Sequence, residues 1–123
     1  MKTNELMIGD WVLYKGEPTI VYEIDDYYQR INTEPDGYDS IKCIEISEIE
    51  SIPLTHDILE KNGWEERPTG HVFYTDGKRY DNSLWYIFGF NTFVVNTAEF
   101  QIKYVHELQH ILKLLNIDKE IEL

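Results

Sequence analysis

Residues 106–110, His-Glu-Leu-Gln-His, are of types that can bind a metal ion and catalyse a reaction. On a helix this H-E-x-x-H pattern places two histidines one turn apart, where both can bind one zinc ion. His106 and His110 would be the metal ligands, and Glu107 would be the general base that activates a bound water. The chemistry that the pattern would support is zinc-dependent hydrolysis.

The hydrophobic periodicity around these residues argues against that chemistry. It predicts a helix from about Ala98 to Leu115, capped at Asn96 or Thr97. A helix advances about 100° per residue, so His106 and His110 lie roughly 160–200° from the centre of the apolar stripe. We therefore expect both histidines on the solvent face, unless the N-terminal half of the chain closes over them. The stripe consists of Tyr104, Val105, Leu108, Ile111, Leu112 and Leu115.

A third zinc ligand is also missing from the expected places. Catalytic zinc takes three protein ligands and keeps one open position. Lys113 and Asn116 occupy the positions of the glycine and the third histidine in the extended motif, which leaves His56 and His71 upstream. We predict no metal ligand, no cofactor and no catalytic residue. A small zinc hydrolase that uses the match at 106–110 remains the alternative.

The charge of the chain limits its partners. Lys and Arg number 11 against 23 Asp and Glu, which gives a net charge of −12 over 123 residues. Such a charge repels phosphate backbones unless basic residues gather on one surface, and the longest basic cluster is Lys78-Arg79. We expect no direct nucleic-acid binding and a protein partner instead. An acidic decoy that mimics nucleic acid is a second alternative.

The cellular location follows from what the sequence lacks. The single cysteine, Cys43, excludes an internal disulfide framework. The opening residues 1–5 contain no apolar core of a secretory signal, and no apolar run approaches the roughly 20 residues that span a bilayer. These features predict a cytoplasmic protein that does not bind membranes.

Residues 1–54 predict a small β-barrel. Turn residues, as at Lys15–Pro18 and Glu34–Gly37, separate five short apolar or alternating segments. This density of strands is typical of an SH3-like barrel. We therefore expect an N-terminal SH3-like domain over 1–54.

The opening residues support the barrel through a resemblance. Ile8–Val12, followed by Tyr14–Pro18, resembles the first strand and turn of barrels in small translation and transcription factor domains. The resemblance implies a binding site at the barrel rim, where we place Trp11, Tyr27 and Tyr28.

Residues 55–123 predict an α+β subdomain. Thr55 is placed to cap a short helix, His56–Asn62, which Gly63 ends. An Asp76-Gly77 hairpin and the strands Leu84–Phe90 and Thr92–Asn96 then predict a β-meander. The fold class is α+β, with the meander packed against the long C-terminal helix.

A second resemblance covers most of the chain. The segments Ile8–Val12, Ile52–Thr55, Ile58–Gly63 and Tyr104–Gln109 resemble those of a group of small acidic uncharacterised proteins of gut bacteria and their mobile elements. The resemblance favours a dedicated accessory or interaction protein over an enzyme. We therefore expect a non-catalytic protein-interaction or accessory module.

The net charge generates the first testable prediction. Added salt screens repulsion among the carboxylates, so the urea midpoint should rise modestly between low and physiological ionic strength. Generic duplex DNA should show no retardation by the protein in a gel at physiological salt. Retardation would contradict the charge argument and would require a basic surface formed by the fold.

Overall fold

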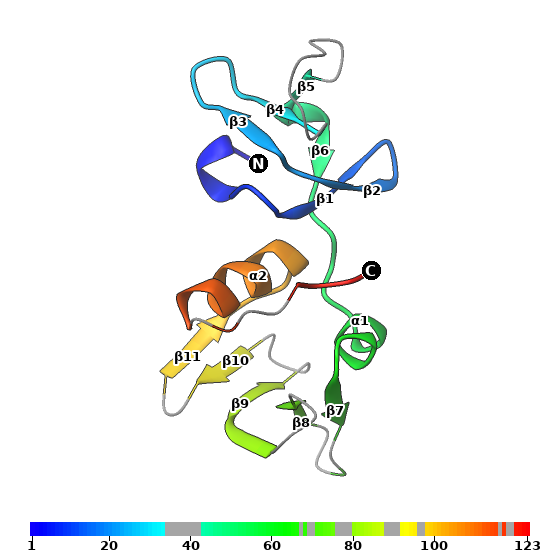
Figure 1. Ribbon diagram of the computed structural model, residues 1–123, viewed down its shortest axis with the longest axis vertical. Coiled ribbons are helices and arrows are strands. Elements are labelled where there is room, and N and C mark those ends of the chain that lie inside the picture. Colours follow the sequence, from blue (N-terminus) through cyan, green and yellow to red (C-terminus); the bar gives the residue numbers. More distant parts are fainter. Residues whose placement is uncertain are drawn as a thin grey trace. The chain divides into compact units, whose positions relative to one another are not determined.

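The chain folds as two compact units (Figure 1). The first unit comprises Met1–Pro53 and Tyr104–Asp118, and the second comprises Leu54–Lys103 and Lys119–Leu123. The first break lies next to the predicted boundary at residue 54, but the first unit also includes residues 104–118, which were predicted to belong with residues 55–123. The computed structural model describes residues 1–33, 43–66, 68, 71–75, 80–87, 92–95, 98–115, 117 and 120–123.

Both units combine antiparallel strands with an α-helix, so the chain is a small α+β protein, as predicted. The described elements of the first unit are η1 (Thr3–Glu5), β1 (Trp11–Tyr14), β2 (Glu17–Ile20), β3 (Glu23–Asp25), β4 (Arg30–Asn32), β5 (Cys43–Glu45), η3 (Ile46–Glu48), β6 (Ile49–Glu50) and α2 (Val105–Leu114). The described helices include none that is long and apolar enough to cross a membrane.

The described strands of the first unit form two three-stranded sheets and no closed barrel. Their orders are β2-β1-β6 and β3-β4-β5. The sheets separate at Val21 and Tyr22, where the backbone changes partner: Val21 N–H donates to Asp10 O at 3.0 Å, and Tyr22 N–H donates to Asn32 O at 2.8 Å. The predicted turn at Glu34–Gly37 lies outside the described residues.

Alternating apolar residues from these short strands form the core of the first unit. Tyr14 and Ile24 pack against it from partly buried positions. Because each strand is only two to four residues long, no strand contributes more than two apolar side chains, and Leu6, Val21 and Ile46 enter the core from outside the strands. The buried members are Leu6, Val12, Val21, Ile31, Ile44, Ile46 and Ile49.

The first helix of the second unit begins and ends at residues that the local sequence determines. Thr55 Oγ1 accepts from Ile58 N–H at 3.3 Å, which confirms the predicted N-cap of α1 (His56–Lys61). Gly63 has a φ of 92° just after this helix, a left-handed conformation that glycine adopts without steric cost.

A five-stranded antiparallel meander follows, in the order β11-β10-β9-β8-β7. Sequence-adjacent strands pair throughout, which confirms the predicted meander. The predicted strand at Leu84–Phe90 starts earlier and forms part of β9, while the predicted Asp76-Gly77 turn lies outside the described residues. The strands are β7 (Trp64–Glu66), β8 (His71–Thr75), β9 (Tyr80–Ile87), β10 (Thr92–Val95) and β11 (Ala98–Gln101).

The predicted start of the C-terminal helix at Ala98 is wrong. Residues 98–101 pair with β10 as strand β11, and the predicted caps Asn96 and Thr97 lie outside the described residues. The helix α2 starts at Val105 instead, because Tyr104 is held extended by a bridge to Pro53. Pairing with the preceding strand thus outweighs the capping signal at residues 98–101.

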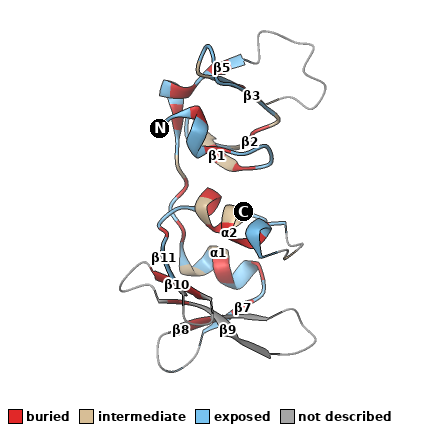
Figure 2. Cartoon of the chain, turned by 90° about the vertical axis from the view of Figure 1, so that its left-hand side faces the viewer, coloured by how far each residue is buried: buried red, intermediate tan, exposed pale blue. Residues whose placement is uncertain are grey.

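The apolar stripe predicted for this helix is buried at most of its positions. Val105, Leu108, Ile111 and Leu112 are buried in α2. Figure 2 shows such buried positions and exposed ones along the same helix.

Two leucines on α2 give a matched test of this burial. Leu112 is 1% exposed and Leu114 is 81% exposed. Leu112→Ala should cost about 2–5 kcal/mol of unfolding free energy as a core truncation, and Leu114→Ala should cost less than about 0.5 kcal/mol. Urea unfolding followed by circular dichroism measures both. Equal losses for the two variants would show that the helix is rotated.

Candidate functional site

The polar face of α2 is covered by the segment that leads into β1. Gln109 Oε1 accepts from Trp11 N–H at 2.9 Å, and Gln109 Nε2 donates to Gly9 O at 3.0 Å. Lys113 Nζ donates to Ile8 O at 3.1 Å. The N-terminal part of the chain therefore covers this face of the helix, as a binding site there would require.

A buried carboxylate, that of Asp10, lies at the centre of this contact. Gly9 takes a φ of 97°, and Asp10 N–H donates to Met7 O at 3.1 Å, which closes a turn in front of β1. The turn directs the carboxylate inward, where Oδ2 accepts from Met7 N–H at 2.7 Å. His110 Nε2 lies 2.7 Å from the same oxygen, and since a carboxylate only accepts, the ring N–H is the donor.

The two histidines are not on a solvent face, contrary to the prediction. His106 is 5% exposed and His110 is partly buried. The rotation of the helix was predicted correctly at Leu108 and Leu112. The opposite face of the helix is not solvated, because a segment about 100 residues away in the sequence covers it. The sequence pattern of the helix does not reveal that segment.

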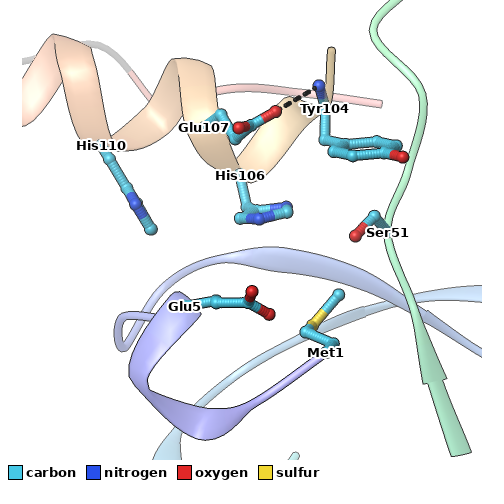
Figure 3. A pocket seen from close by; sticks show the side chains of 7 residues that line it. All are labelled: Met1, Glu5, Ser51, Tyr104, His106, Glu107 and His110. Carbon is cyan, nitrogen blue, oxygen red and sulfur yellow. Dashed lines mark hydrogen bonds between the residues drawn. The ribbon is translucent and has the colours of Figure 1, made fainter. Parts of the chain in front are cut away.

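The histidines line a pocket of about 430 Å³ (Figure 3). The His106 ring stacks on Tyr104, with centroids 5.9 Å apart and planes at 7°, and meets His110 edge-on at 5.7 Å. Burial lowers the pKa of His106 from its ordinary value, although the charge of Asp10 acts in the opposite direction. The lowered pKa favours the neutral form of the ring. The lining residues are Met1, Glu5, Ser51, Tyr104, His106, Glu107 and His110.

Glu107 has a structural role that competes with catalysis. Its Oε1 accepts from Tyr104 N–H at 3.0 Å and closes a capping box at the start of α2. In Figure 3 this carboxylate turns back along the helix toward Tyr104. A general base must reach a substrate or a bound water, so this geometry does not favour Glu107 as the base of a hydrolase.

Two acidic residues of this site were not singled out from the sequence. Asp10 bonds His110, and Glu5 lines the pocket opposite His106 (Figure 3). Neither belongs to a spacing motif with the histidines, because about 100 residues separate them. The signal that could have drawn attention to Asp10 is its position after Gly9 and before an apolar strand.

A second histidine cluster lies on the second unit. His56 Nδ1 is 3.7 Å from Glu60, and His56 Nε2 is 3.5 Å from Glu66. Among the described residues, these three form the one group of ligand types whose atoms all lie within 4.8 Å of one another. Both carboxylates are exposed. The side chain of His71 lies outside the described part of the chain.

The aromatic residues predicted at a rim lie in different settings. Tyr27 and Tyr28 follow β3 and contact each other edge-on, with ring centroids 4.8 Å apart. Both are exposed. Trp11 is half-buried at the start of β1, where its backbone N–H bonds Gln109.

Comparisons of the chain with protein-family models, with curated proteins and with solved structures find no match. Each role assigned to a residue therefore rests on its own geometry.

We expect the contact between Asp10 and His110 to contribute measurably to folding. Each of Asp10→Ala and His110→Ala leaves a polar group without its partner, and a double-mutant cycle should give a coupling of about 1.5–3 kcal/mol, the range for hydrogen bonds to charged groups. The control cycle on His56 and Glu66, a more exposed pair, should give less than about 1 kcal/mol. A coupling near zero for the first pair would contradict the docking of α2 through Asp10.

Proposed function

We propose that the protein is a non-catalytic binding module for a protein partner, and that Tyr27 and Tyr28 are its central contact residues. The observation that carries the proposal is their exposure on an anchored turn: Tyr27 is 86% exposed and Tyr28 is 63% exposed. Tyrosine is enriched at protein interfaces, where its ring buries a large area at a small entropic cost.

The turn between β3 and β4 is fixed by its own hydrogen bonds. Asp25 Oδ1 accepts from the N–H groups of both Tyr27 and Tyr28, each at 3.1 Å. Gln29 Nε2 donates to Asp26 O at 2.7 Å. This network holds the backbone under the two rings, so a partner would find them largely pre-organised.

A second set of bonds ties the turn to the rest of the unit. Gln29 Nε2 donates to Thr3 Oγ1 at 2.8 Å, and Thr3 N–H donates to Gln29 Oε1 at 3.2 Å. The Gln29 carbonyl accepts from Ile46 N–H at 2.9 Å. Thr3 is buried, so the base of the turn is part of the packed unit while its tip carries the rings.

The charges around the turn favour a basic surface on the partner. The Arg30 guanidinium lies 5.2 Å from the centroid of the Tyr28 ring, which shows that this ring accepts a cation on its face. Asp25 and Asp26 precede the rings, and the chain carries a net charge of −12. Long-range attraction would therefore speed association with a basic partner.

The order of strand pairing supports an SH3-like arrangement of the first unit as part of this proposal. β1 pairs with β2 and β6, β4 pairs with β3 and β5, and the 3₁₀ turn η3 precedes β6. In such an arrangement β2 and β3 act as one bent strand, and the tyrosine turn connects it to the next. Turns of this kind form the rim of small barrels.

Affinity capture from the native host tests the tyrosine turn. The double variant Tyr27→Ser/Tyr28→Ser should capture at least tenfold less of the partner than the wild-type chain does. The reason is that central interface aromatics each contribute about 2 kcal/mol or more to binding. Quantitative mass spectrometry measures the loss, and titration of the purified partner confirms it.

Leu114→Ser is the matched control, since it removes an exposed apolar side chain from α2, another element of the same unit. It should leave the captured partner unchanged. Circular dichroism should show equal folding of all three proteins. Retention of the partner by the double tyrosine variant would refute the assignment of the turn.

A further inference from the structure

Two buried polar atoms beside the pocket of α2 lack the partners that burial requires. Asp10 and His106 are both more than nine-tenths buried. Within the described part of the chain, Asp10 Oδ1 and His106 Nδ1 have no hydrogen-bond partner. An unsatisfied buried group costs about 1–3 kcal/mol, and such groups in a native protein point to a bound water or ion.

The side chains at this place are metal ligands by type. Imidazole nitrogens and carboxylate oxygens bind zinc and its neighbours in the first transition series. His106 and His110 lie one helical turn apart with ring centroids at 5.7 Å, and Asp10 already contacts His110 at 2.7 Å. Two imidazoles that line the pocket and the carboxylate that contacts one of them are therefore close together.

The charge of the pocket favours a cation. Glu5 and Glu107 line it, and its described lining residues include no lysine or arginine. Asp10 Oδ1 is an acceptor, and His106 Nδ1 is one when the ring proton is on Nε2, so a metal ion in this acidic surrounding would satisfy both atoms.

We propose that a divalent transition-metal ion, with Zn²⁺ as the reference, binds in this pocket to His106, His110 and Asp10. Three protein ligands leave a fourth position open toward the pocket, to be filled by water. Because Glu107 caps the helix, the ion acts as a structural clamp between α2 and the turn in front of β1. The proposal is independent of the tyrosine turn and adds a site to the same unit.

Binding requires a small rearrangement of these side chains. Their ligand atoms are not grouped as closely as those of His56, Glu60 and Glu66. The ion replaces the hydrogen bond between His110 and Asp10 and draws the His106 ring toward the carboxylate. The pocket of about 430 Å³ beside the ring gives it room to turn (Figure 3).

The His56 cluster is the less suitable site despite its short distances. Its two carboxylates lie near different nitrogens of one ring, Glu60 at Nδ1 and Glu66 at Nε2. One ion can take only one lone pair from that ring, so one of the two carboxylates would lie next to the nitrogen that does not bind the ion, although all three ligand atoms lie within 4.8 Å of one another. All its donors are also open to water, which already solvates them.

Titration of the chelator-treated full chain with Co²⁺ tests the proposal, since the visible absorption of Co²⁺ reports its ligands. We expect one ion per chain, displaced by Zn²⁺, and a rise in Tm because the metal binds only the folded state. His106→Gln and Asp10→Asn should each weaken binding at least tenfold. His56→Gln, the matched control, should bind as the wild type does.

Circular dichroism verifies that the variants fold. If His106→Gln does not fold, His106→Phe, which keeps a ring against Tyr104, provides the same measurement. Absence of binding by the wild type at micromolar metal would overturn the proposal and leave an ordered water as the partner of the buried atoms. Loss of binding in His56→Gln, but not in the His106 variant, would overturn it in favour of the exposed cluster.

Discussion

The buried carboxylate of Asp10 is the interaction on which the first unit depends. It joins the turn at Met7 to the ring of His110, and its own backbone carbonyl bonds Val21 at the junction of the two sheets. Without this group, only Gln109 and Lys113 would hydrogen-bond the polar face of α2 to the backbone of the segment before β1. The carboxylate therefore decides that this helix face is an interior surface.

The H-E-x-x-H match takes on a structural meaning in this setting. Glu107 caps α2, His110 holds Asp10, and His106 is packed between two rings. Each role needs the residue type that the motif also needs, so the pattern alone does not separate a cap and a docking contact from a hydrolytic centre. The direction of the Glu107 carboxylate favours the cap, because it bonds the backbone of Tyr104.

Local signals predicted the parts of the fold that depend on neighbours in sequence. Three features could be predicted because each depends on only a few consecutive residues: the cap at Thr55, the helix end at Gly63 and the meander of sequence-adjacent strands. The candidate site could not be predicted from the sequence, because Asp10 and His110 lie 100 residues apart in it. The start of α2 was predicted wrongly for a different reason: residues 98–101 pair with the preceding strand β10, and this local pairing outweighs the local cap.

The most direct test of this account is the amide hydrogen exchange of Trp11, measured by NMR. Its N–H is bonded to the side chain of Gln109, so its protection reports the docking of α2 rather than the ladder of β1 and β2. If α2 docks as described, this amide exchanges at least about tenfold more slowly than in an unfolded chain, and Gln109→Ala removes the protection while the amides that pair β1 with β2 keep theirs. Exchange of the Trp11 amide at the unfolded rate in the native protein would contradict this docking.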